Sequence, residues 1–224
     1  MDSARSAGRV IGILLLVQAV IGSTVNFVLL APEFTGASTF LTNAAPNATR
    51  LSIAALLLLV AGVVSITITT TAFPIFRRGS ERLAMAYFGM GVAGIALAAV
   101  EGAAIMSMLT LSKQHVEAPA TDARLFEVLG GVVRYGRYWA HYTNLLIGSF
   151  TVFLFYVALF RFSLVPRLLA GIGLITVLVQ MTGLTMPFFG DRVNFYLLTP
   201  MGIVFLILAV WLIVRGFNDV ERMS

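Results

Sequence analysis

The sequence predicts an all-α integral membrane protein, a bundle of six transmembrane helices. Three observations lead to this fold class. The chain of 224 residues is 59% apolar and only 11% charged, and its mean hydropathy is +0.95. Apolar runs of about 20 residues, long enough to cross a bilayer, occur six times. Arginines lie at the ends of these runs rather than in a polar region of their own. This composition excludes a soluble domain and a disordered chain.

The six spans are expected at residues 10–30, 51–76, 83–111, 134–160, 168–189 and 195–214. They absorb about 120 residues, which leaves short connections, so we expect residues 1–224 to form a single transmembrane domain. The first span has an alternative interpretation as a signal peptide, because Arg5 and Arg9 precede its apolar run. That run is longer than such a peptide needs, and no convincing cleavage site follows it.

Arginine placement predicts the orientation of the spans. Under the positive-inside rule, the side with more Lys and Arg next to the spans faces the cytoplasm. Nine arginines fall on the side that carries both chain ends, and four basic residues fall on the other side. The nine are Arg5, Arg9, Arg77, Arg78, Arg82, Arg161, Arg167, Arg215 and Arg222, and the four are Arg50, Lys113, Arg124 and Arg192. The N- and C-termini are therefore expected to be cytoplasmic.

Small residues and two longer connections complete the pattern. The third span is rich in Gly and Ala, which allow helix backbones to approach closely in lipid, and Gly8 and Gly12 have the spacing of a helix-packing motif. Residues 31–50 contain Pro, Thr and Asn and are expected to form an irregular or partly amphipathic cap. Residues 112–127 carry mixed charges and are expected to be a solvated connection.

Glu101 is the strongest candidate for a functional residue inside the membrane. An ionisable side chain at membrane depth costs several kcal/mol, so it requires a partner, a wet cavity or a function. Counting about 1.5 Å per residue from Leu83, Glu101 lies about 27 Å up the third span. His141 lies about 28 Å up the fourth span, counted back from Phe160. The two side chains are expected at the same depth, in the outer part of the membrane.

The fourth span carries four polar residues on one face, since Arg134, Arg137, His141 and Asn144 are spaced by three, four and three positions. One interpretation is structural: Arg137 or Arg134 neutralises Glu101, while His141 and Asn144 fix the helix register. The other makes the cluster the floor of an outward-facing pocket for a lipid headgroup or a small amphiphile. Asn26 and Thr185 are candidates to join it, and the neighbouring tyrosines and Trp139 are typical of an interfacial belt.

No catalytic, nucleotide or metal signature is visible, so no catalytic residue, metal site or cofactor is expected. Scattered arginines argue against a nucleic-acid partner. We expect a non-enzymatic membrane protein whose partners are lipids, with a possible small amphiphilic ligand. One alternative is a membrane-embedded enzyme using Glu101 and His141 as acid and base. Another is a small-molecule transporter, although the inner halves of the first, fourth and sixth spans supply few polar residues beyond Gln18.

Three sequence motifs resemble a known family. The clearest is the run Leu208-Ala209-Val210-Trp211-Leu212-Ile213-Val214-Arg215-Gly216-Phe217-Asn218, which resembles the closing signature of the bacterial six-span family called domain of unknown function 4386. The others are Gly136-Arg137 followed by His141, and Leu164-Val165-Pro166-Arg167-Leu168-Leu169 followed by Gly171 and Gly173. The resemblance implies a multi-pass protein of the bacterial inner membrane with no activity established at family level. It also implies acidic residues in the third and sixth spans, yet residues 202–206 contain none.

Overall fold

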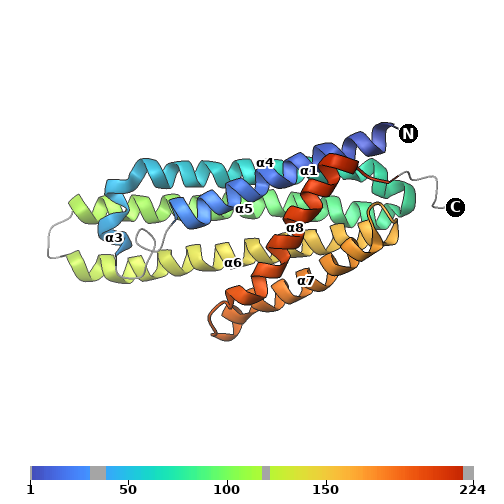
Figure 1. Ribbon diagram of the computed structural model, residues 1–224. Helices are drawn as coiled ribbons and strands as arrows, with labels where there is room; N and C mark the ends of the chain where they lie inside the picture. The colour runs from blue at the N-terminus through green and yellow to red at the C-terminus, as the bar shows by residue number, and fades with distance from the viewer. Residues whose placement is uncertain (1, 31–38, 118–121, 219–224) are drawn as a thin grey trace. The chain divides into compact units, whose positions relative to one another are not determined.

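The computed structural model describes residues 2–30, 39–117 and 122–218. These residues form helices joined by short connections, and no strand occurs among them (Figure 1). Six helices are long and apolar enough to cross a membrane. The protein is thus an all-α, six-span membrane protein, as the apolar runs predict.

The helices match the six expected spans and extend beyond most of them. Two short elements precede the second span, namely α3 (Phe40–Asn43) and a 3₁₀ turn (Ala45–Asn47). Two spans end in a different helix type. Helix α1 continues as a wider π-helix (Thr24–Leu29), and α7 continues as a tighter 3₁₀ turn (Met186–Phe189). The long helices are α1 (Asp2–Ser23), α4 (Ala48–Gly79), α5 (Glu81–Glu117), α6 (Ala123–Arg161), α7 (Arg167–Thr185) and α8 (Phe195–Arg215).

The expected connection at residues 112–127 is largely helical instead. Helix α5 continues to Glu117 and α6 begins at Ala123. The His115 and Phe126 rings, one on each helix, lie 5.2 Å apart. Charged residues did not end the helices, because an exposed helical turn keeps its backbone hydrogen bonds and lets charged side chains reach water. Of the cap expected at residues 31–50, residues 31–38 lie outside the described part, and the remainder is mostly helical.

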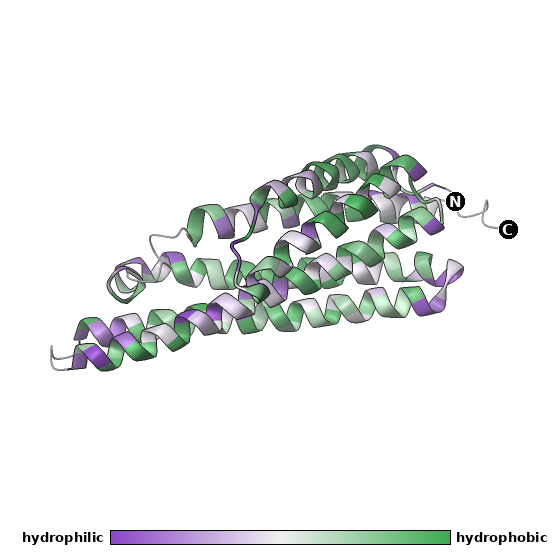
Figure 2. Cartoon of the chain, turned by 90° about the horizontal axis from the view of Figure 1, so that it is seen from below, coloured by the Kyte–Doolittle hydropathy of each residue, from purple (hydrophilic) through white to green (hydrophobic). Residues whose placement is uncertain are grey.

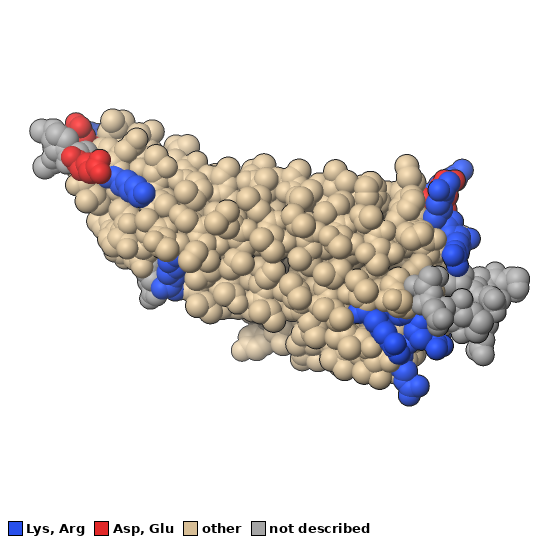
Figure 3. Space-filling view, turned by 90° about the horizontal axis from the view of Figure 1, so that it is seen from above, with Lys and Arg blue, Asp and Glu red and all other residues tan. Residues whose placement is uncertain are grey.

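The described helices group into two compact units. Unit 1 comprises Met1–Ala19, Val63–Gly94 and Leu145–Ser224, and unit 2 comprises Val20–Gly62 and Ile95–Asn144. Helices α4, α5 and α6 each contribute residues to both units. In Figure 2, hydrophobic residues dominate the middle of the helices and hydrophilic residues concentrate toward their ends. In Figure 3, most of the visible surface is uncharged and the visible charged side chains lie in separate groups, as expected for spans in lipid.

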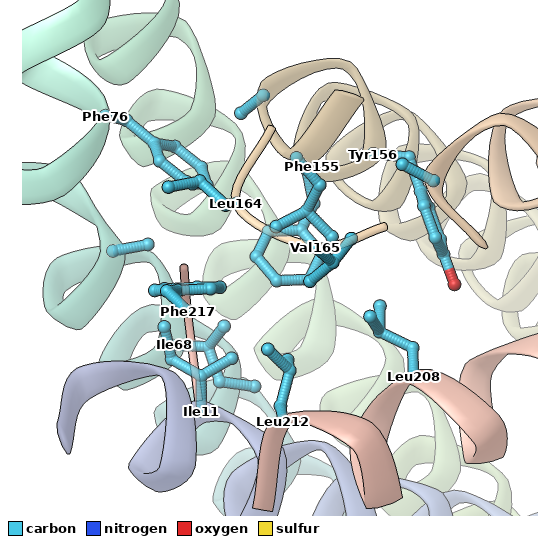
Figure 4. Close-up of a cluster of buried hydrophobic side chains, with 14 of the residues drawn as sticks. Ile11, Ile68, Phe76, Phe155, Tyr156, Leu164, Val165, Leu208, Leu212 and Phe217 are labelled. Carbon is cyan, nitrogen blue, oxygen red and sulfur yellow. The ribbon is translucent and has the colours of Figure 1, made fainter. Parts of the chain in front are cut away.

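Unit 1 has an aromatic and aliphatic core, shown in part in Figure 4. Phe155 of α6 stacks on Tyr87 of α5 with ring centroids 5.7 Å apart, and Phe76 of α4 packs against both rings. Leu208 and Leu212 of α8 are buried in the same core. Glycines bring α1 close to this core, because a Cβ on Gly12 would lie 2.8 Å from the Ala209 carbonyl oxygen. The Gly8 and Gly12 spacing therefore marks a real packing face against α8 and the residues after it.

Unit 2 has a smaller aliphatic core built on α4 and α5. Its buried members include Leu51, Ala54 and Ala55 of α4 and Ile105 and Leu109 of α5. A Cβ on Gly102 of α5 would touch the carbonyl oxygen of Ala55 at 3.4 Å. This close approach of α4 and α5 places Glu101, the residue before Gly102, in a buried part of unit 2.

Candidate functional site

The candidate site lies in unit 2 and is formed by α5 and α6. Helix α5 supplies Glu101, whose side chain is 1% exposed. Helix α6 supplies His141 and Asn144, which are three positions apart and therefore share a helix face. Glu101 and His141 face each other, so the two residues lie at the same level of their helices.

Both oxygens of the Glu101 carboxylate accept hydrogen bonds from α6. Nδ1 of His141 lies 2.7 Å from Oε1, and Nδ2 of Asn144 donates to Oε2 at 2.9 Å. Two hydrogen bonds to a carboxylate compensate part of the cost of burying it. The contact also orients the imidazole, because the bond at Nδ1 determines the direction in which Nε2 points. His141 makes no other hydrogen bond to the described residues, and its side chain is 18% exposed.

Arg137 stands one turn before His141 on α6. It lies within electrostatic range of Glu101, but no ion pair within 4 Å joins them in the described part of the chain. Its Nε is buried and has no hydrogen-bond partner there. Arg134 is turned elsewhere, since its guanidinium lies 4.2 Å from the centre of the Tyr135 ring. Among the described residues, His141 and Asn144 are therefore the direct partners of Glu101, and Arg137 acts on it through its charge at longer range.

Aromatic side chains surround the same stretch of α6. The rings of Tyr138 and Tyr142 lie 4.7 Å apart, and the Tyr138 and Trp139 rings lie 5.2 Å apart. Tyr142 also contacts the His141 ring at 5.3 Å. Tyr135 is exposed, as is Trp139. This arrangement agrees with an interfacial belt that continues directly into the polar cluster.

Asn26 and Thr185, the two further candidates for the cluster, each donate a hydrogen bond to the preceding helical turn. The Asn26 amide donates to the Gly22 carbonyl at 2.9 Å, four residues earlier. The Thr185 hydroxyl donates to the Thr182 carbonyl at 2.9 Å. Short polar side chains commonly satisfy themselves on the preceding helical turn.

Ser112 is a polar residue whose role the sequence did not indicate. It is fully buried in unit 2, where its hydroxyl donates to the Leu41 carbonyl at 2.8 Å and accepts from the Ala45 amide at 2.9 Å. Ser112 thereby joins α5 to the short elements before α4. The only available signal was a lone serine after an apolar span, which by itself predicts nothing.

Two of the family-like motifs meet in unit 1. Gly216 ends α8 with φ of 70°, a conformation that favours glycine, and a Cβ there would meet the Arg5 carbonyl. Phe217 is then buried in the unit 1 core. Asn218 donates from its backbone to the Leu164 carbonyl at 2.8 Å and from its side chain to the Ser163 carbonyl at 2.9 Å. The closing motif is thus hydrogen-bonded to the turn between α6 and α7.

Gln18, the polar residue noted on the first span, lines a cavity of about 70 Å³ in unit 1. Ser65, Tyr87 and Thr151 contribute the other polar groups of this lining. Thr151 already donates to the Ile147 carbonyl of its own helix at 3.0 Å. The cavity is large enough to hold water beside these polar groups.

Comparison with known proteins agrees with the family resemblance of the sequence motifs. The family described as Domain of unknown function (DUF4386) matches residues 10–216. No curated protein and no solved structure gives a match. The matched stretch begins in the first span, includes Glu101 and the α6 cluster, and ends at Gly216. The chain belongs to the DUF4386 family.

Proposed function

We propose that this protein binds the polar headgroup of a lipid or small amphiphile at the site formed by Glu101, Arg137, His141 and Asn144. One observation supports the proposal most. Glu101 uses both carboxylate oxygens within the protein, while Arg137 and Nε2 of His141 make no hydrogen bond to the described residues. The site therefore presents the N–H donors of Arg137 and the Nε2 atom of His141 without partners among the described residues, on a helix face next to aromatic side chains.

Each residue has a separate role in this proposal. Glu101 and Asn144 are positioning residues, because they hold His141 and do not themselves face the ligand. Arg137 supplies a permanent positive charge and a planar set of N–H donors, which suits a phosphate or carboxylate headgroup. His141 adds Nε2, whose direction the Glu101 contact sets.

Most buried polar groups in proteins are hydrogen-bonded, so a cluster that only fixed the helix register would leave few of them without a partner. Leaving a guanidinium nitrogen buried without an acceptor is costly in a membrane. Glu101 lies within electrostatic range and offsets part of this cost. A bound headgroup would supply the missing acceptor, and this is our physical reason for preferring binding to packing alone.

We place the protein in a bacterial inner membrane with both termini in the cytoplasm. The support is the excess of arginines on one set of flanks and membership of the DUF4386 family. With this orientation, the cluster of unit 2 belongs to the outer leaflet. The ligand would then be an outer-leaflet lipid or an amphiphile that enters from that side.

A second candidate function is catalysis by His141 as a general base. The 2.7 Å contact from Glu101 to Nδ1 is the arrangement by which a carboxylate orients a catalytic imidazole. Binding ranks first because it uses both Arg137 and His141, whereas catalysis by His141 leaves the buried Nε of Arg137 without a role. The two functions separate experimentally, since catalysis requires that a lipid be converted and not merely retained.

The test is a comparison of the lipids that remain bound to the purified protein. Wild type, Arg137→Gln and Arg134→Gln are extracted from native membranes under identical conditions, and bound molecules are identified by mass spectrometry. Arg134→Gln is the matched control, because it removes the same charge one turn away. We expect wild type and Arg134→Gln to retain a common amphiphile, and Arg137→Gln to lose at least about 90% of it, a tenfold loss in occupancy. Equal retention in all three would contradict the proposal.

A further inference from the structure

Four arginines from separate segments of unit 1 line one cavity. They are Arg5 of α1, Arg78 near the end of α4, Arg161 at the end of α6 and Arg167 at the start of α7. The cavity has a volume of about 800 Å³. Ser163 and Asn218 are the uncharged residues with polar side chains in its lining, and no carboxylate is among the described lining residues.

The wall of this cavity is held by specific contacts. Ser163 has a positive φ of 51°, which is uncommon for a residue other than glycine. Its carbonyl accepts from the Asn218 side chain at 2.9 Å, and its hydroxyl accepts from Nε of Arg167 at 3.2 Å. Phe217 anchors the adjacent backbone in the core. The guanidinium of Arg167 and the turn after Arg161 are therefore positioned by the fold.

The positive-inside rule accounts for arginines on these flanks but not for their convergence on a hollow. Arg77 and Arg82 have the same topological role, yet neither lines the cavity. Arg77 pairs instead with Glu81 at 3.1 Å. Like charges that share a hollow repel each other, so an anion bound between them lowers the electrostatic energy.

We propose that this cavity binds a phosphate-bearing anion with at least two negative charges. Guanidinium groups match phosphate oxygens with paired N–H donors, and four of them suit more than one phosphate or a highly charged one. The volume is in the range of ligand sites, about 300–1,000 Å³, and exceeds that of one phosphate group. The phosphate source is either the headgroup of an anionic lipid or a water-soluble phosphate compound. This site in unit 1 is independent of the Glu101 site in unit 2.

The experiment uses the full chain in phosphatidylcholine nanodiscs and follows its thermal unfolding. In one arm, inorganic pyrophosphate is titrated as the soluble probe. In the other, the nanodiscs contain a fraction of cardiolipin and no pyrophosphate. A ligand that binds the folded state raises the unfolding temperature. We expect at least one arm to do so, and the responding arm identifies the phosphate source.

Paired variants make the outcome specific to the cavity. We expect the double variant R78Q/R167Q to weaken the apparent affinity at least about tenfold. The matched control R77Q/R82Q removes two charges from flanks outside the cavity and is expected to change it less than about twofold. The variant R78K/R167K keeps the charges, and thus the topology, but loses the paired donors; we expect an intermediate loss. If R78Q/R167Q does not fold, R78K/R167K still tests whether the cavity binds the anion. Equal effects of R78Q/R167Q and R77Q/R82Q, or no stabilisation of wild type by either anion, would overturn the proposal.

Discussion

Nδ1 of His141 lies 2.7 Å from Oε1 of Glu101, and this contact joins α6 to α5 in unit 2. The carboxylate is buried, so its hydrogen bonds are worth more than those of an exposed pair. Asn144 engages the other oxygen from the next helical turn. The helix pair and the candidate ligand site therefore depend on the same three side chains.

The first prediction concerns the coupling of Glu101 and His141. In a double-mutant cycle with Glu101→Gln and His141→Gln, the coupling free energy should be about 1 kcal/mol or more. The same cycle with Thr143→Val is the control, because Thr143 has no hydrogen bond to Glu101, and its coupling should be near zero. Unfolding of the detergent-solubilised protein measures both. Additive losses for Glu101 and His141 would show that the contact does not stabilise the fold.

The second prediction concerns the end of α8. Gly216→Ala should destabilise unit 1 by about 2 kcal/mol, because its φ is positive and the added Cβ would meet the Arg5 carbonyl. Gly202→Ala on the same helix has open space around its Cβ and should be neutral or stabilising by up to about 1 kcal/mol. Denaturant unfolding distinguishes them. Equal effects of the two substitutions would contradict the described junction.

The third prediction concerns packing of α4 against α5. A Cβ on Gly91 would collide with the Thr69 side chain, whereas a Cβ on Gly89 would meet nothing within 4 Å. Gly91→Ala should therefore lower the unfolding free energy by about 1–3 kcal/mol, and Gly89→Ala should not lower it. If both variants unfold like wild type, α4 and α5 do not approach closely at Gly91.

The sequence predicted the spans better than their ends. Apolar runs locate the part of a helix that lies in lipid, but α5 and α6 continue past it through polar residues that the bilayer does not constrain. Four of the threonine hydroxyls of α4 illustrate what local sequence can explain. Thr67, Thr70 and Thr71 each donate to a carbonyl four residues earlier, and Thr69 to one three residues earlier.

The sequence predicted which residues form the candidate site but not which of them would bond directly to Glu101. Helical spacing and depth brought Glu101 together with His141 and Asn144, because both rules depend only on helix geometry. Which α6 side chain contacts the carboxylate depends on side-chain direction and length. The sequence therefore did not show whether Arg137 or His141 would be the direct partner of Glu101. The hydrogen bond between Asn218 and Ser163 joins residues 55 positions apart, so no local sequence pattern could predict it.

The fourth prediction tests the orientation of the spans. The chain has no cysteine, so single cysteines introduce unique labelling sites without a background. In intact bacterial cells, Arg82→Cys should resist a membrane-impermeant maleimide, and Lys113→Cys should react with it. Both should react after the membrane is opened. The reverse pattern in intact cells would place the termini outside.

The most direct test of the central proposal is an experimental structure of the protein in nanodiscs that retain native lipids, at a resolution that shows bound headgroups. We predict density within hydrogen-bond distance of Nε2 of His141 and the guanidinium of Arg137, with the Glu101 contacts to His141 and Asn144 unchanged. Mass spectrometry of the same sample would identify the molecule. A dry cluster, with Arg137 bonded only to protein groups and no density beside His141, would contradict headgroup binding and leave the cluster a structural joint between α5 and α6.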